Sequence, residues 1–177
     1  TRRSSDLSPD GQRIYVLDSG NARIQVFDSN GTFQAQFGGP GDGPGQFNPG
    51  FGGPCGGIDV GPNGTIYATD TWGAGGRGRV LVFDAAGNPV NSWSEAEPGG
   101  GFFGPRGLAV APDGRVFVSD TGHKRLVVFT ADGRFMNTIG GEGAGPGQFV
   151  EPVGLTVTSN NEVYVADVGN RRIQVLG

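Results

Sequence analysis

Residues 107–139 read GLAVAPDGRVFVSDTGHKRLVVFTADGRFMNTI, in which runs of β-branched and aromatic residues alternate with turn signals. Such runs favour short strands, and the sequence predicts four of them, at 107–110, 116–119, 125–129 and 135–139. The segments PDG and ADG supply turns, and Gly114 and Gly133 occupy positions that need a positive φ. The stretch therefore predicts one antiparallel meander of four strands.

This unit occurs four times along the chain. Its second predicted strand ends in aspartate each time, and the equivalent residues are Asp18, Asp70, Asp120 and Asp167. These aspartates are 52, 50 and 47 residues apart, and a fixed period of this length is typical of stacked or radial arrays. The other predicted strands are 57–60, 65–68, 80–83 and 90–93 in the second unit, 14–17, 24–27 and 33–37 in the first, and 154–157, 163–166 and 172–176 in the fourth.

The first and last units depart from this pattern. Residues 4–8 (SSDLS) stand where the other units have apolar runs such as GLAV, so we expect a polar substitute for a buried strand. In the last unit Asn161 replaces the turn glycine, because Asn tolerates a positive φ. No segment shows a sustained 3.6-residue apolar period, so the expected helix content is close to zero.

Equal four-stranded meanders with a short, small-residue-rich first strand describe the blades of a β-propeller. Bulky Phe27, Phe83 and Phe129 are expected between neighbouring sheets. The predicted fold is all-β, a partial β-propeller of about three and a half blades. The approximate blades are 8–56, 57–106, 107–153 and 154–177. An incomplete arc leaves apolar faces uncovered, so we expect self-association or contact with further blades of a parent chain.

Glycine-rich connectors join the units. Two of them share a pattern, GGPGDGPGQF at 38–47 and GGEGAGPGQF at 140–149, while SEAEPGGGFF at 94–103 has drifted but keeps the aromatic end. We expect the terminal aromatic residues to plug the space between neighbouring sheets; these are Phe47, Phe103 and Phe149. A ligand contact is the alternative role.

Composition excludes several classes of function. The 177-residue chain carries a net charge of −4, which argues against a nucleic-acid surface because phosphate contacts need a basic patch. The single cysteine, Cys55, cannot form an internal disulfide, which fits a reduced compartment or a bacterial extracytoplasmic protein without disulfides. The sequence contains no run of 18 apolar residues, so no membrane-spanning helix is predicted. The compartment stays open, with the extracytoplasmic one slightly favoured.

The most frequent polar feature is a turn that follows the second strand, with the pattern D-x-x-(N/H)-x-R in three units. The predicted pairs are Asp18–Arg23, Asp70–Arg79, Asp120–Arg125 and Asp167–Arg172. A carboxylate there can accept backbone N–H bonds and pair with the guanidinium. Because a catalytic group is rarely needed in every repeat, this recurrence favours a structural role.

The strongest binding candidates are Trp72 and Arg77, on an insertion that lengthens the Asp-to-Arg spacing of the second unit from five to nine. Trp and Arg are enriched at binding hot spots. The alternative is that Trp72 folds back over its own blade. Further candidates, on neighbouring loops or near the mouth of the central channel, are Cys55, Arg106, His123, Lys124 and Arg171.

Two of these candidates have simpler interpretations. His123 occupies the position of Asn21 and Asn170, where we expect a left-handed backbone. A single histidine cannot build the multi-histidine zinc site of some propeller lyases. Cys55 has no neighbouring base in the sequence and is expected to be an inert thiol. No metal ligands, cofactor motif or catalytic residues are predicted.

In a propeller the connectors share one face with the loops between second and third strands. We call this the loop face; it should collect 38–56, 94–106 and 140–153 with 18–23, 70–79, 120–125 and 167–172. The opposite, hairpin face should hold only short turns. Because loops on a rigid scaffold carry function, the loop face is the predicted binding surface.

The joint pattern of P-x-G-[LI]-x-V, P-[DN]-G-x-[VI]-[YF]-V-x-D and G-x-G-x-G-P-G-Q-F resembles the NHL repeat over residues 8–177. The resemblance implies part of a six-bladed propeller. Residues 1–7, TRRSSDL, resemble a translated adapter remnant, so we expect a non-native or truncated N-terminus and a fragment of a longer bacterial or metagenomic protein.

These observations favour a non-catalytic binding or scaffolding module for a protein, peptide or glycan. Two alternatives remain open. One is a piece of a propeller lyase or hydrolase with an axial metal, which would need several inward-pointing His, Asp or Glu residues. The other is an extracytoplasmic sensor domain of a membrane protein. RNA binding, known for some NHL propellers, is disfavoured by the acidic balance.

Overall fold

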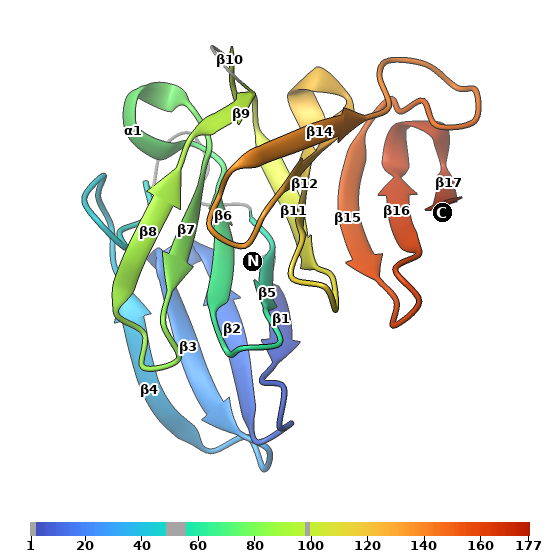
Figure 1. Ribbon diagram of the computed structural model, residues 1–177. Coiled ribbons are helices and arrows are strands. Elements are labelled where there is room, and N and C mark those ends of the chain that lie inside the picture. The colour runs from blue at the N-terminus through green and yellow to red at the C-terminus, as the bar shows by residue number, and fades with distance from the viewer. Residues whose placement is uncertain (1–2, 49–55, 98–99) are drawn as a thin grey trace.

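The computed structural model describes residues 3–48, 56–97 and 100–177. It contains four small antiparallel sheets that follow one another around their first strands (Figure 1). These inner strands are β1, β5, β11 and β15, and they pack next to one another in chain order. The predicted all-β partial propeller is confirmed.

Each sheet is a meander in sequence order. The first consists of β1 (Arg3–Leu7), β2 (Arg13–Asp18), β3 (Arg23–Asp28) and β4 (Phe33–Gly38). The second consists of β5 (Ile58–Val60), β6 (Ile66–Asp70), β7 (Arg79–Phe83) and β8 (Pro89–Trp93). The third consists of β11 (Pro105–Val110), β12 (Val116–Asp120), β13 (Arg125–Phe129) and β14 (Phe135–Ile139), and the fourth of β15 (Pro152–Val157), β16 (Val163–Asp167) and β17 (Arg172–Leu176).

The remaining elements are short. The strands β9 (Glu95–Glu97) and β10 (Gly100–Gly101) pair within the second connector. Helical structure in the described residues is limited to α1 (Gly73–Gly76) and single 3₁₀ turns at Ser19–Asn21, Thr121–His123 and Val168–Asn170. No described helix has the length and apolar character needed to cross a membrane.

The first blade has an inner strand at the position where the sequence predicts a polar substitute for a buried strand. Residues Arg3–Leu7 form a regular inner strand in which Ser5 pairs with Val16 and Asp6 with Tyr15. The polar residues therefore complete the blade. An inner strand needs ladder hydrogen bonds mainly to its one neighbour, and the Asp6 carboxylate receives a backbone N–H from the next blade, that of Val60. Burial of large apolar side chains is not required there.

The core consists of three apolar layers, one between each pair of neighbouring blades. Phe83 is buried in the first layer and Phe129 in the second, as predicted, whereas Phe27 is only half-buried and packs on Phe33. A fully buried Leu or Phe contributes roughly 1.5–3 kcal/mol relative to an exposed one, so these layers are the main force that holds blade to blade.

The predicted aromatic plugs are present at two connectors and shifted at the third. Phe47 and Phe149 are fully buried. Phe103 was expected to be the third plug, but its side chain is 55% exposed and Phe102 is buried instead, with its ring 5.8 Å from that of Phe129. An isolated antiparallel bridge from Gly78 to Phe102 sets this register, and a shift of one residue in extended chain turns the side chain to the other side.

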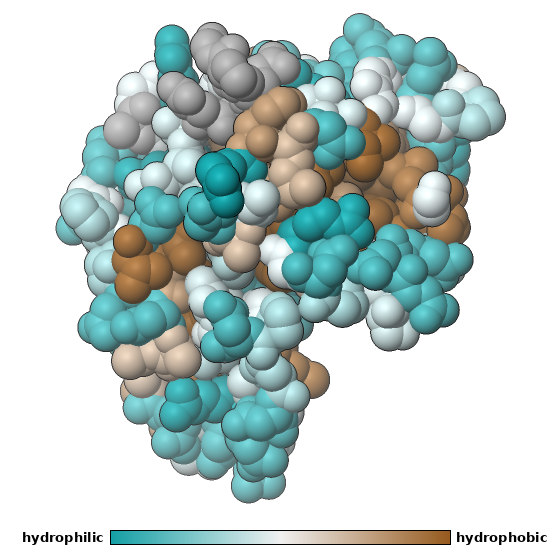
Figure 2. All heavy atoms as spheres, in the orientation of Figure 1, coloured by the Kyte–Doolittle hydropathy of each residue, from teal (hydrophilic) through white to brown (hydrophobic). Residues whose placement is uncertain are grey.

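The last blade exposes an apolar face. Ile173 is 70% and Val175 52% exposed, whereas the equivalent Val80 and Val82 of the second blade are buried against the third. Figure 2 shows hydrophobic side chains gathered over β15, β16 and β17. Self-association through this face remains a prediction.

Candidate functional site

The turn aspartate of the second blade holds the preceding connector in place. The Asp70 Oδ2 atom lies 3.0 Å from Arg79 Nε, and the carboxylate also receives the backbone N–H of Asn48, just after the Phe47 plug. The other nitrogens of Arg79 donate to connector carbonyls, at 2.8 Å to Asp42 O and 2.7 Å to Gln46 O. One Asp–Arg pair therefore clamps one blade to the loop that leads into it.

The fourth blade repeats this clamp. Asp167 Oδ2 receives Arg172 Nε at 3.3 Å and Asn170 Nδ2 at 2.7 Å, while Oδ1 receives the backbone N–H of Val150 at 3.0 Å. Arg172 Nη2 donates to Gln148 O at 2.7 Å. Because the carboxylates of these turns receive several donors each, they organise the loops.

The two clamps differ in charge stabilisation. Burial raises the pKa of Asp70, despite hydrogen bonds from Asn48 and Arg79. At Asp167 burial acts in the same direction, but the hydrogen bonds of Asn170, of the Val150 and Glu151 N–H groups and of Arg172 outweigh it, so the pKa lies below its usual value.

His123 has a different role from the one its sequence position suggested. The left-handed backbone falls one residue later in each turn, at Ala22 (φ 55°), Lys124 (φ 56°) and Arg171 (φ 55°). His123 Nδ1 lies 2.8 Å from Asp120 Oδ2, as Asn21 Nδ2 lies 2.8 Å from Asp18 Oδ2. The position therefore requires a nitrogen that reaches the turn carboxylate, which Asn and His share. The predicted pairs Asp18–Arg23 and Asp120–Arg125 are also present, at 3.1 and 3.0 Å.

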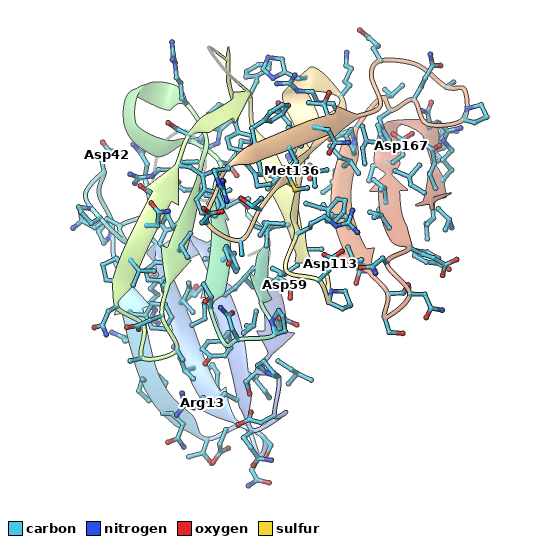
Figure 3. All side chains as sticks on the ribbon, in the orientation of Figure 1. Arg13, Asp42, Asp59, Asp113, Met136 and Asp167 are labelled. Atoms are coloured by element: carbon cyan, nitrogen blue, oxygen red, sulfur yellow. The ribbon has the colours of Figure 1, made fainter. Side chains whose placement is uncertain are left out.

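Two aspartates on inner strands were not singled out from the sequence. Asp6 Oδ2 receives the N–H of Val60 at 2.8 Å, and Asp59 Oδ2 receives the N–H of Val110 at 2.6 Å, so each carboxyl bridges to the next inner strand. Burial, and then the hydrogen bond and charge of Asp6, raise the pKa of Asp59 to about 8. Figure 3 shows Asp59 near the centre of the molecule, away from Asp42 and Asp167 at the loop face and from Arg13 at the other end.

Hydroxyl groups make a further set of bridges between blades. Thr69 Oγ1 donates to Arg106 O and Ser119 Oγ to Val153 O, both at 2.8 Å. These side chains immediately precede the turn aspartates. Alternation in Y-A-T-D and F-V-S-D could have indicated them, because a small hydroxyl residue recurs at one strand position.

The remaining sequence candidates lie on the loop face in different surroundings. Arg77 is exposed and Trp72 only partly so. Arg106 Nη1 pairs with Glu151 at 3.0 Å, and Lys124 Nζ with Glu142 at 2.6 Å. Arg171 is exposed in its left-handed turn position. Cys55 lies outside the described residues.

The structure brings three residues from separate segments near one another. The Gly78–Phe102 bridge puts Arg77 opposite Phe103, and the Phe103 ring lies 5.7 Å from that of His123. We call Arg77, Phe103 and His123 the rim cluster. The sequence predicts Arg77 and His123 as separate binding candidates and Phe103 as a plug between sheets.

A family model described as a 6-bladed beta-propeller matches residues 4–49 and 108–175, more than half of the chain. The chain belongs to this propeller family. No curated protein matches its sequence.

Solved propeller structures share the fold at low sequence identity. A streptogramin B lyase matches with a TM-score of 0.67 at 18% identity, covering 96% of this chain and 49% of the lyase. A gluconolactonase from Xanthomonas campestris gives 0.65 and 17%, covering 97% and 60%, and a structure of a nidogen/laminin complex gives 0.68 and 20%, covering 97% and 57%. The chain thus spans roughly half to three fifths of these structures, and the likeness establishes fold alone.

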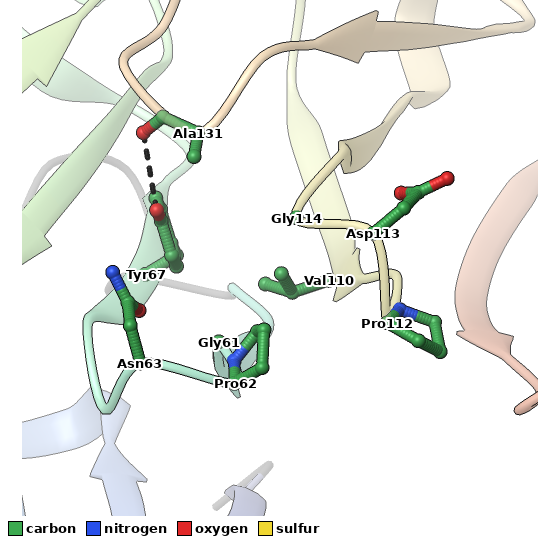
Figure 4. A pocket seen from close by; sticks show the side chains of 9 residues that line it. All are labelled: Gly61, Pro62, Asn63, Tyr67, Val110, Pro112, Asp113, Gly114 and Ala131. Atoms are coloured by element: carbon green, nitrogen blue, oxygen red, sulfur yellow. Dashed lines mark hydrogen bonds between the residues drawn. The ribbon is translucent and has the colours of Figure 1, made fainter.

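The hairpin face of this propeller segment is not featureless. A shallow pocket of about 180 Å³ lies between the turns of the second and third blades, lined by Pro62, Tyr67, Val110, Asp113 and Ala131 among others (Figure 4). Tyr67 Oη donates to Ala131 O at 3.1 Å across it. The pocket is smaller than the ~300 Å³ usual for a small-molecule site. Within the described residues, no group of three or more His, Cys, Asp or Glu could hold a metal ion.

Proposed function

We propose that this propeller segment is a non-catalytic binding or scaffolding module of the NHL type, which holds a protein, peptide or glycan on its loop face. The supporting observation is the use made of each turn. The turn carboxylates are committed to holding connectors, while apolar side chains stand exposed on those connectors and loops; these are Phe103, Val150 and Val168. Exposed apolar groups on a rigid scaffold are typical of interaction surfaces.

Nucleic acid is not the proposed partner, because the chain is acidic and phosphate contacts need a basic surface. The enzyme alternative, a lyase or hydrolase with an axial metal, draws on the names of two solved propellers below 25% identity. Metal analysis of the purified chain tests it. A stoichiometric zinc or calcium ion that survives dialysis would favour the enzyme, and its absence after metal supplementation would leave the binding module as the better hypothesis.

Partner capture tests the binding function itself. The full 177-residue chain is immobilised and exposed to a random dodecapeptide library on phage and to a glycan array. The proposal expects ligands whose affinity falls when Trp72 and Arg77 are replaced by Ala, with unchanged β content and melting temperature. Ligands that bind only the apolar face of the last blade, or no ligand in either screen, would overturn it.

A further inference from the structure

The rim cluster is built on a fixed backbone. The Phe103 N–H donates to the buried Asp120 Oδ1 at 2.8 Å, and Phe103 O receives the N–H of Gly122 at 2.8 Å. A Cβ at Gly122 would lie 2.2 Å from Phe103 Cδ1, so glycine is what lets the ring sit over this turn. The aromatic ring is therefore placed on the surface by the fold, and its exposure does not depend on a flexible loop.

The polar atoms of the cluster point to an acidic ligand. Asp120 already receives Arg125 Nε at 3.0 Å and faces His123 Nδ1, which leaves the second ring nitrogen of His123 for a ligand. His123 is 46% exposed, and no side chain of the described residues pairs with the exposed Arg77. The nearby Glu142 is paired with Lys124. The cluster thus offers an exposed guanidinium and the outer ring nitrogen of His123 beside an exposed aromatic ring.

We propose that Arg77, Phe103 and His123 form a docking site for a peptide segment that carries a carboxylate next to an apolar or aromatic side chain. This proposal rests on the binding function above and assigns its site and partner chemistry. The carboxylate pairs with the Arg77 fork, and the apolar side chain packs on the Phe103 ring. With Nδ1–H directed at the Asp120 carboxylate, His123 presents Nε2 as an acceptor for a backbone N–H of the segment.

The fixed backbone at Phe103 favours binding. A ligand side chain that packs on Phe103 does not have to order a loop, since the connector backbone is already tied to Asp120 and Gly122. Preorganisation of this kind reduces the entropic cost of association. Aromatic and arginine side chains that lie together are also the residues that dominate measured interface energies.

The experiment selects dodecapeptides from a random phage library against the full chain and measures synthetic copies by fluorescence polarisation. We expect selected peptides with Asp or Glu near Phe, Leu or another apolar residue. Phe103→Ala and Arg77→Gln should each weaken binding about fivefold or more, as for an interface contact worth more than about 1 kcal/mol. His123→Asn keeps the nitrogen that reaches Asp120 and removes the ring, so it should weaken binding without unfolding the turn.

Matched controls are available on the same chain. Phe33→Ala removes an equally exposed phenylalanine from the first blade, and Arg134→Gln removes an exposed arginine from the hairpin face. Neither should change the affinity by more than about twofold. Raising the salt concentration should weaken binding to the wild-type chain but have less effect on Arg77→Gln, because the carboxylate contact is lost there.

Each other outcome overturns a defined part. Peptides that bind equally to wild type and all three cluster variants would overturn the site while leaving the binding function standing. Selected peptides that are neutral or basic and still depend on Phe103 would overturn the acidic partner. Glycans that bind at the cluster in place of peptides would overturn the peptide assignment, and a library that yields no binders would overturn the docking site altogether.

Discussion

Different connectors fill the junction between the third and fourth blades and the junction between the second and third blades. At the former, Phe149 fills the gap and Arg172 holds the connector carbonyls. At the latter, the plug is Phe102, and the following residue, Phe103, stands on the surface beside an insertion. Both junctions therefore need an aromatic plug and a connector backbone held by hydrogen bonds. A connector that keeps both can vary its other residues, and at the second of these junctions the varied residue is Phe103 of the rim cluster.

Removing the regular plug should have the largest effect. Phe149→Ala leaves a cavity between two sheets, and we expect a loss of about 3–5 kcal/mol in the free energy of unfolding, measured by urea denaturation. Phe103→Ala is the matched substitution at the other junction. Its loss should stay within about 0.5 kcal/mol, because the side chain is mostly exposed. Equal losses for the two variants would contradict the assignment of plug and surface residue.

The loss of stability on removing a clamp arginine should be larger where that arginine is more deeply buried. Arg79→Ala leaves Asp70, which is fully buried, without its counter-ion and also removes the bonds to Asp42 O and Gln46 O. We expect a loss of about 3 kcal/mol. The Arg172 side chain is more exposed and Asp167 keeps three other donors, so Arg172→Ala should cost about 2 kcal/mol.

Thermal and urea unfolding of the two arginine variants measure this difference. Arg134→Ala, on the hairpin face, is the control for loss of an exposed arginine and should change stability by less than about 0.5 kcal/mol. A larger loss for Arg172→Ala than for Arg79→Ala would show that the connector carbonyls matter more than the buried carboxylate.

The repeat pattern predicted the blades because strand alternation, turn glycines and the Asp–Arg spacing are local signals. It located Phe47 and Phe149 correctly, since the two GPGQF connectors share one register. It failed at Phe103, because the Gly78–Phe102 bridge that sets the register joins segments distant in sequence. The interaction of Asp6 with Asp59 and the N–H of Val60 was not predictable for the same reason, because two inner strands some fifty residues apart meet only in the fold.

The stability of the junctions should differ in its pH dependence, because the inner strand of the second blade carries Asp59 where that of the third blade carries Ala109. The pKa of Asp59 is raised in the folded state from 3.8 to about 8, so the folded chain binds more protons than the unfolded chain between these values. Stability should therefore fall as the pH rises through this window. Asp59→Asn mimics the protonated form and should be more stable than wild type by roughly 2 kcal/mol at pH 9, with little difference at pH 4.

Urea denaturation from pH 4 to 9 checks this prediction. Asp113→Asn, on the hairpin face, serves as the control carboxylate and should leave the pH dependence unchanged. A wild-type stability that is flat between pH 5 and pH 8, or an Asp59→Asn variant that shows the same decline as wild type, would contradict the raised pKa of Asp59.

The smallest expected effect concerns the surface pair of Lys124 and Glu142. Glu142 is 73% exposed, and exposed ion pairs contribute about 0–1 kcal/mol, so Glu142→Gln should change stability by less than about 0.5 kcal/mol. This result would indicate that Phe149 and Arg172, and not the surface ion pair, stabilise the third connector. The same variant should have the opposite effect on peptide binding. Lys124 adjoins His123 in the chain, so removal of its acidic partner should raise the affinity of an acidic dodecapeptide about twofold. A loss of more than about 1 kcal/mol in stability would show that this exposed ion pair has a structural role, and a fall in peptide affinity would contradict the acidic partner.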